Sequence, residues 1–142
     1  MIAVDSNVLV FAHRSDSPWH EAATSALARL SGGRWGIPWP CIHEFLAIAT
    51  HPRVFDPPTP LDDAIAAVES WRATSVALLG ETDEHWQHLA GLARAGKVAG
   101  PLVHDARVAA ICLQHAVEEL WTADRDFSRF PALRVRNPLV AA

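Results

Sequence analysis

Four acidic side chains occupy positions where a soluble protein would more often carry an apolar or turn-forming residue: Asp5, Glu44, Asp105 and Asp124. Asp5 directly follows the short apolar run of residues 1–4, which is typical of a buried β-strand that ends at a site. Asp124 closes a second such run, residues 119–123, in the same way. The other two acids fall on the apolar faces of expected helices, where a charge needs a partner.

Four carboxylates gathered in one crevice would repel each other, and most of them would not stay ionised without a neighbouring cation. A divalent metal resolves this conflict, and oxygen ligands suit Mg²⁺ or Mn²⁺. Such ions leave coordination positions for phosphate oxygens, so the pattern is typical of a site that cleaves phosphodiester bonds. Each acid taken alone is also explained as a turn, cap or solvated helix residue. The spacing by itself therefore leaves the metal site and the purely structural explanation both open.

The positions of the acids depend on an alternation of strands and helices along the chain. Short apolar runs predict strands at residues 1–4, 34–37, 75–79, 119–123 and 133–135. Helical spacing, caps and closing Gly or Pro residues predict helices at 7–12, 18–31, 41–50, 60–71, 81–96 and 102–116. This alternation predicts an α/β fold with a mainly parallel sheet that is covered on both faces. In such sheets the functional crevice lies at the carboxyl ends of the strands, where Asp5 and Asp124 are expected.

Local patterns add more specific expectations. Ser17, followed by a proline and then an acid, predicts the N-cap of the second helix. Trp86 is expected to face inward from the helix over 81–96. Cys41 and Cys112 lie in apolar helical patterns without the spacing of a zinc site or a disulfide, so both are expected to be buried thiols.

Length and composition fit one compact domain, residues 1–142, because 142 residues that are 50% hydrophobic can bury one core but not two. The formal net charge of -4 and the sequence pI of about 6.0 argue against a chain that holds nucleic acid by bulk electrostatic attraction. A local basic patch is still compatible with these totals. No apolar run approaches the ~18 residues that span a bilayer, and no signal sequence is recognisable, so a cytoplasmic protein without membrane contact is expected.

A phosphoacceptor domain of the receiver type also gathers acids at strand ends and offers a different explanation of the pattern. That kind of site requires a lysine after a late strand. The only lysine of the chain, Lys97, stands at the end of an expected helix, so this explanation is disfavoured.

Four short segments around the acids match a known family. The opening VDSNVLV, with its acid at Asp5, resembles the first motif of PIN-domain endoribonucleases, and WPCIHEFL resembles the second with its acid at Glu44. VHDARVAA is similar to the third motif, whose aspartate falls on Asp105, and LWTADRDF is similar to the fourth, whose acid falls on Asp124. The similarity runs nearly end to end, and it is closest to the VapC toxins of type II VapBC toxin-antitoxin systems.

The resemblance implies a three-layer α/β/α domain with a central sheet of about five strands, acting as a toxin and Mg²⁺-dependent endoribonuclease, with Mn²⁺ able to substitute. Asp5, Asp105 and Asp124 would bind the metal, and Glu44 would complete the catalytic set. Asn7 and Ser6 would orient Asp5. A homodimer is implied, as is a cognate VapB-type antitoxin that forms a hetero-oligomer with the toxin and blocks its active-site groove. The alternative is a catalytically silent PIN-fold module that only binds RNA or protein.

An acidic enzyme that cuts an acidic polymer needs local positive charge. The candidates for phosphate contacts lie near the site segments or on the adjacent loop: Arg14, Arg53, Arg107, Arg125 and Arg129. Arg14 and Arg125 are the first choices because they are closest in sequence to site acids, although surface ion pairs explain such residues equally well. Asp126 stands two residues after Asp124 and is near enough to share or take over its role. Thr122 is expected to support Asp124 by hydrogen bonding.

Overall fold

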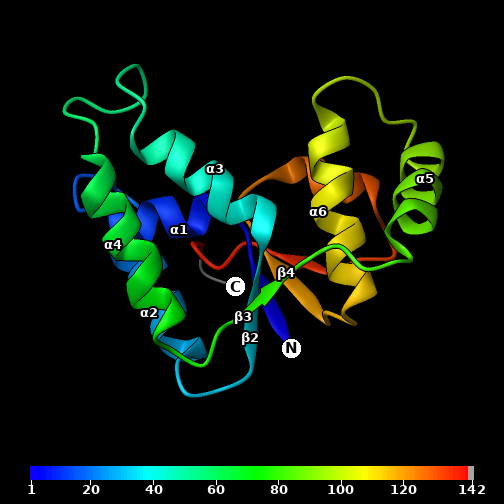
Figure 1. Ribbon diagram of the computed structural model, residues 1–142, viewed down its shortest axis with the longest axis horizontal. Helices are drawn as coiled ribbons and strands as arrows, with labels where there is room; N and C mark the ends of the chain where they lie inside the picture. The colour runs from blue at the N-terminus through cyan, green and yellow to red at the C-terminus, as the bar shows by residue number, and fades with distance from the viewer. Residues whose placement is uncertain (141–142) are drawn as a thin grey trace.

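The computed structural model describes residues 1–140 and shows an α/β fold built around one sheet (Figure 1). In that part of the chain the sheet has five strands, all parallel, in the order β3-β2-β1-β4-β5. Their bounds are β1 Ile2–Val4, β2 Trp35–Pro38, β3 Ala77–Leu79, β4 Glu119–Trp121 and β5 Val135–Arg136. All of them lie at or beside the runs that the sequence predicts, so the predicted α/β class and parallel sheet are confirmed.

Six α-helices and one 3-10 helix, η1, surround this sheet within residues 1–140. Their bounds are α1 Ser6–His13, α2 His20–Leu30, α3 Trp39–Ala49, α4 Leu61–Arg72, α5 His85–Ala95, α6 Leu102–Gln114 and η1 Arg125–Arg129. In Figure 1, α1 to α4 lie on one side of the strands and α5 and α6 lie on the other. The three expected layers are therefore present.

β1 lies at the centre of the sheet, and its position determines where a site can form. Its Ala3 and Val4 are fully buried, as expected for a central parallel strand covered on both faces. The strand order reverses beside it, because the chain first adds β2 and β3 on one side and then β4 and β5 on the other. Open α/β sheets bind ligands outside the strand ends at such a switch point. Asp5 and Asp124 follow the two strands that meet there.

The helices that carry the other two acids start close to strand ends. α3 follows β2 without a loop, because Pro38 is both the last residue of the strand and the N-cap of the helix. α6 begins after Gly100, whose φ of 59° favours glycine and turns the chain into the helix. The inner face of α6 includes small residues such as Ala106, which is fully buried and lets the helix lie close to the sheet. Glu44 on α3 and Asp105 on α6 are positioned in this way.

Three expectations about helices are wrong. The helix expected from residue 81 begins at His85, so Glu81 lies in the loop before α5. The second helix begins at His20, because Ser17 Oγ accepts a hydrogen bond from the Trp19 backbone N at 3.1 Å and thereby closes a turn that precedes α2. Trp86 does not face inward, since 73% of its surface is exposed. α5 packs on α6 at the outside of the molecule, and its inner contacts come from Leu89 and Leu92 (Figure 1).

Two further features of the described chain bear on its chemistry. The thiols of Cys41 and Cys112 are free and buried, as the sequence predicts. Within residues 1–140, no helix has both the length and the apolar character that crossing a membrane requires.

Candidate metal centre

Asp5 lies directly after β1 and caps the N-terminus of α1, so the strand end and the helix start fix its carboxylate. Its Oδ1 accepts hydrogen bonds from the Ser6 backbone N at 2.7 Å and from Cys41 Sγ at 3.3 Å. Its Oδ2 accepts hydrogen bonds from Thr122 Oγ1 at 2.7 Å and from Asn7 Nδ2 at 3.2 Å. Only 6% of Asp5 is exposed, and this burial raises the pKa of its carboxyl group, although the hydrogen bonds favour the charged form.

Asn7 and Thr122 connect Asp5 to the end of β4. Thr122 Oγ1 accepts hydrogen bonds from Asn7 Nδ2 at 2.9 Å and from the Asp124 backbone N at 3.0 Å, while it donates to Asp5. Asn7 Oδ1 accepts a hydrogen bond from the Ala123 backbone N at 3.0 Å. The two residues make the supporting hydrogen bonds that the sequence predicts, and they hold the ends of β1 and β4 in a fixed relation.

Three more acids meet near Asp5. One carboxylate oxygen from each of Asp105, Asp124 and Asp126 lies within 4.8 Å of the other two. Asp105 comes from the first turn of α6. The other two come from the start of η1, where Asp124 Oδ1 accepts a hydrogen bond from the Asp126 backbone N at 2.9 Å. The sequence leaves open which of these two acids serves the site, and the fold brings both of them to Asp105.

The ionisation of Asp105 reflects this crowding. Partial burial is the largest cause of its altered pKa, and the charge of Asp124 is the second. Smaller contributions come from the charges of Asp5, Asp126 and Glu44. Together they raise the pKa of the Asp105 carboxyl group to about 7. A cation bound among these oxygens would favour the charged form and release the proton.

Glu44 lies at the margin of this cluster, on α3. Its Oε1 accepts a hydrogen bond from Ser6 Oγ, and the Ser6 backbone N donates to Asp5, so Ser6 links the two acids. The Glu44 side chain is exposed and lines a groove of about 330 Å³ together with His104 and Arg107. The oxygens that lie within 4.8 Å of one another come from Asp105, Asp124 and Asp126, so Glu44 is a neighbour of this cluster and not a member of it.

Arg14 is directed to other partners. Its guanidinium group pairs with Asp16 at 2.6 Å and donates to Thr59 Oγ1 at 3.2 Å. It also lies 4.3 Å from the ring centroid of Phe55. The hollow that Arg14 lines, about 360 Å³ in volume, is bounded by the proline-rich loop between α3 and α4 and by none of the four predicted site acids. The structure therefore does not bring Arg14 to the candidate centre.

Arg125 lies in a hollow that also includes one of the site acids. It is exposed and lines a hollow of about 540 Å³ together with Thr122 and Asp124. An exposed arginine in the same hollow as Asp124 is a suitable candidate for contact with a phosphate.

The role of Cys41 was not identified from the sequence, and Arg107 was only one of several candidate phosphate contacts. Cys41 donates to Asp5, and the available signal was its position on the same face of α3 as Glu44, three residues earlier. Arg107 is one of the candidate arginines near the site segments, and the structure places it in a groove with Glu44. Neither contact follows from spacing along the chain.

The donor set of this centre consists of carboxylate oxygens. It fits a hard divalent cation better than metals that prefer thiolate or imidazole ligands. The raised pKa of Asp105 fits as well, because burial and the neighbouring carboxylates both disfavour its charged form, which a bound cation would favour. Fold and site thus define a class of α/β proteins that gather carboxylates at the switch point of a parallel sheet. The family profile of the PIN domain matches residues 2–133, and the chain belongs to the PIN-domain family.

Curated relatives extend this assignment. The chain is 37% identical over 142 residues to ribonuclease VapC43 of Mycobacterium tuberculosis, covering 98% of this chain and 96% of that one. It is 32% identical over 137 residues to ribonuclease VapC48 of the same species, covering 94% of each. The predicted membership of the VapC ribonucleases is therefore confirmed.

Solved structures share the fold at lower identity. VapC20 of Mycobacterium tuberculosis, described as a sarcin-ricin loop cleaving toxin, has a TM-score of 0.69 at 17% identity, covering 90% of this chain and 93% of that one. FitAcB from Neisseria gonorrhoeae has a TM-score of 0.71 at 19% identity, covering 97% and 98%. At such identities the likeness concerns the fold alone.

Proposed function

We propose that this protein is the toxin component of a type II toxin-antitoxin system and hydrolyses RNA phosphodiester bonds as a Mg²⁺-dependent endoribonuclease, for which Mn²⁺ can substitute. The observation that carries the proposal is the convergence of oxygens from Asp105, Asp124 and Asp126 within 4.8 Å, next to the buried Asp5. Identity of 37% and 32% to proteins named as ribonucleases supports RNA as the substrate. The chain would act as a single PIN domain, residues 1–142.

In this proposal Asp5, Asp105 and Asp124 hold the metal, and Asp126 is placed to share the position of Asp124. The chemistry that a bound Mg²⁺ supplies is activation of a water molecule and neutralisation of charge on the scissile phosphate. Asp5 is held in one orientation, because five hydrogen bonds fix its two oxygens. Asp105 contributes a carboxylate that gives up its proton near neutral pH when a cation binds.

Glu44 is the remaining catalytic residue of the proposal. Its side chain is exposed, and Ser6 Oγ donates to one of its oxygens, so the carboxylate is oriented but still accessible. A carboxylate in that setting can accept the proton of the attacking water.

We further propose a VapB-type antitoxin as the partner and a homodimer as the toxin's own assembly. Related folds occur in a toxin-antitoxin complex from Klebsiella pneumoniae and in VapBC2 from Rickettsia felis bound to a DNA fragment from their promoter. Those proteins share 18% and 14% identity with this chain, so the proposal for its partner depends mainly on the VapC relatives.

The test is cleavage of a labelled single-stranded RNA by the purified protein in EDTA, in Mg²⁺ and in Mn²⁺. Cleavage should require metal and should fall by ~100-fold or more in Asp5→Asn and in Asp105→Asn, since each removes several kcal/mol of charge stabilisation. Asp62→Asn, an exposed acid in the first turn of α4, is the control and should retain activity. Calorimetry with Mn²⁺ distinguishes the nuclease from a catalytically silent binding module. Absence of Mn²⁺ binding, or binding that is unchanged in Asp5→Asn, would favour the silent module.

A further inference from the structure

The groove beside Glu44 contains an arginine side chain, Arg107, that has no role yet in the proposed reaction. This groove lies between α3 and α6 and is lined by His43, Glu44, His104 and Arg107, among others. Arg107 carries the only permanent positive charge among its lining residues, because a guanidinium stays protonated at all physiological pH values. A groove that joins a site acid to an arginine is suited to an anionic group of the substrate.

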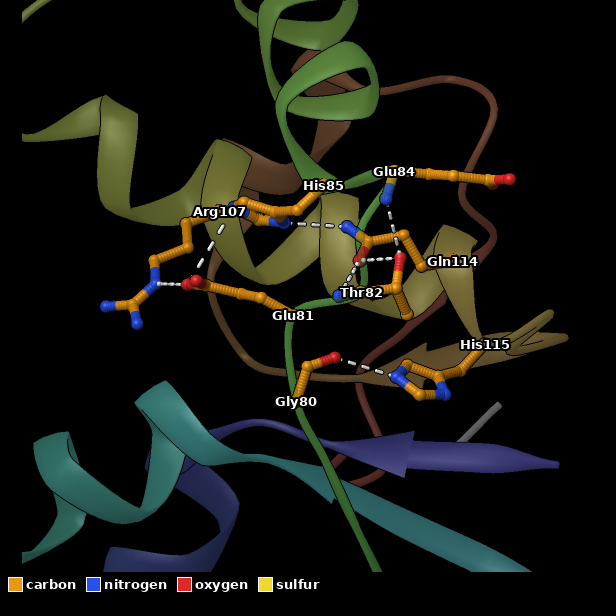
Figure 2. A network of polar contacts seen from close by, with 8 residues as sticks. All are labelled: Gly80, Glu81, Thr82, Glu84, His85, Arg107, Gln114 and His115. Atoms are coloured by element: carbon orange, nitrogen blue, oxygen red, sulfur yellow. Dashed lines mark hydrogen bonds and ion pairs between the residues drawn. The ribbon is translucent and has the colours of Figure 1, made fainter.

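Glu81 holds Arg107 by one edge of its guanidinium group. Arg107 Nε donates to Glu81 Oε1 at 2.6 Å, and this ion pair joins the loop after β3 to α6. Within residues 1–140, Nη1 and Nη2 have no hydrogen-bond partner, and Figure 2 shows them directed away from Glu81 and from the rest of the network. A guanidinium held in this way still presents a fork that can bind a phosphate through two parallel hydrogen bonds.

The backbone on both sides of Glu81 is anchored to α6, the helix that carries its partner. His115 Nε2 donates to the Gly80 carbonyl at 2.8 Å, and Gln114 Oε1 accepts hydrogen bonds from the Thr82 backbone N and Oγ1, each at 2.9 Å (Figure 2). An isolated surface ion pair contributes about 0 to 1 kcal/mol and fixes little. Here Glu81 stands between two anchored residues, so the loop keeps the guanidinium in one orientation.

The acids lie between this groove and the hollow that Arg125 lines. Glu44 belongs to the first and Asp124 to the second, and the hydrogen bonds around Asp5 connect the two sides. Each side therefore pairs one site acid with one arginine. A polymer with regularly repeated phosphates offers one phosphate to each arginine and another to the acids, whereas a nucleoside monophosphate has only one phosphate to offer.

We propose that Arg107, oriented by Glu81, binds a backbone phosphate of single-stranded RNA on the opposite side of the scissile phosphate from Arg125. This inference depends on the proposed function, because it requires an RNA strand across the acids. Arg107 thereby takes the role of second phosphate contact, for which Arg14 is not positioned. Glu81 is a positioning residue, since it acts on the RNA only through Arg107.

The test measures RNA binding separately from cleavage. Anisotropy of a labelled single-stranded RNA of about 12 nucleotides is recorded with Asp105→Asn protein in EDTA over a range of salt concentrations. Adding Arg107→Gln should weaken binding by about 10-fold, the loss of one charge-assisted contact. It should also reduce the slope of log K against log salt by ~0.7, the value for one phosphate contact on a single strand. Arg72→Gln, which breaks an ion pair of similar type on α4, is the matched control and should change neither quantity.

Two more variants separate charge from orientation. Arg107→Lys keeps the charge but loses the fork, so it should retain the salt slope and recover only part of the affinity. Glu81→Gln should weaken binding by about two- to fivefold if Glu81 orients Arg107. If Glu81 only neutralised Arg107, the same change would tighten binding. In the otherwise wild-type enzyme, Arg107→Gln should raise KM more than it lowers kcat.

The outcomes that overturn this inference differ from those that overturn the proposed function. Unchanged affinity and unchanged salt slope in Arg107→Gln would overturn it even if the wild-type protein cleaves RNA. Absence of RNA binding by the Asp105→Asn protein would do the same, and tighter binding in Glu81→Gln would remove the positioning role. A wild-type protein that binds RNA through Arg107 but does not cleave it with Mg²⁺ or Mn²⁺ would instead contradict the proposed nuclease.

Discussion

Asp105→Asn should stabilise the metal-free protein at pH 8, although it removes a residue that the proposed reaction requires. In the folded protein the pKa of the Asp105 carboxyl group is about 7, compared with an ordinary value of 3.8 in the unfolded chain. The folded state therefore binds this proton more tightly. Its stabilising effect is fully present below pH 3.8 and is lost as the pH rises through 7. Asparagine does not ionise, so the variant does not lose stability as the pH rises through 7.

The size of the effect follows from the pKa difference. Between 3.8 and about 7 there are about 3 pH units, which at 1.36 kcal/mol per unit sets an upper bound of about 4 kcal/mol. Asp105 is only partly buried, so solvent screens the repulsion, and we expect a gain of about 1 to 2 kcal/mol in the free energy of unfolding. For a chain of this length the gain corresponds to a rise in Tm of about 3 to 8 °C.

Urea denaturation followed by tryptophan fluorescence in EDTA measures this gain. At pH 5 the folded wild-type protein still holds the Asp105 proton, so less than half of the gain at pH 8 should remain. Saturating Mn²⁺ should reverse the order of stabilities at pH 8. A ligand at 100 times its Kd stabilises the native state by about 2.7 kcal/mol, and the variant has a weakened site.

The control is Asp62→Asn, whose side chain is exposed in the first turn of α4 and should give no gain at either pH. An Asp105→Asn protein that is no more stable than the wild type at pH 8 in EDTA would refute the electrostatic reasoning. A gain that persists undiminished at pH 5 would refute it as well, because it would have a cause other than ionisation.

Three further changes test the supporting structure. Thr122→Val removes a buried hydrogen-bond donor to Asp5, so it should lower the free energy of unfolding by about 1 to 3 kcal/mol and the calorimetric Mn²⁺ affinity by about 10- to 100-fold. Unchanged Mn²⁺ affinity would show that this hydrogen bond does not hold the ligand. Arg14→Gln should lower the free energy of unfolding by about 1 kcal/mol, because it removes the contact with Phe55, while kcat/KM for RNA stays within about twofold. Trp86→Gln should change the free energy of unfolding by less than about 0.5 kcal/mol in the same urea assay, because the ring is exposed.

The sheet and the acids could be predicted because both follow from local pattern and topology. Apolar runs without alternation indicate strands covered on both faces, and the carboxyl ends of parallel strands meet at one edge. A short side chain directly after such a strand, such as Asp5, must lie at that edge of the sheet, and Asp124, three residues after the end of β4, lies close to it. The start of α2 was harder to place, because Ser17 caps a turn as readily as a helix and only the packing of the helix selects His20.

The positions of the arginine side chains could not be predicted from local sequence. Arg14 is close to Asp5 in sequence, but it is the C-cap of α1, whose eight residues at about 1.5 Å each carry it ~12 Å away along the helix. Arg107 is only two residues from Asp105, and residues two apart on a helix do not face each other. Its direction is instead determined by Glu81, 26 positions away in sequence, in a loop that hydrogen bonds anchor to α6. A long cationic side chain is therefore placed by its tertiary partner, so the sequence can name Arg107 as one candidate among five, and the ion pair with Glu81 in the folded chain singles it out.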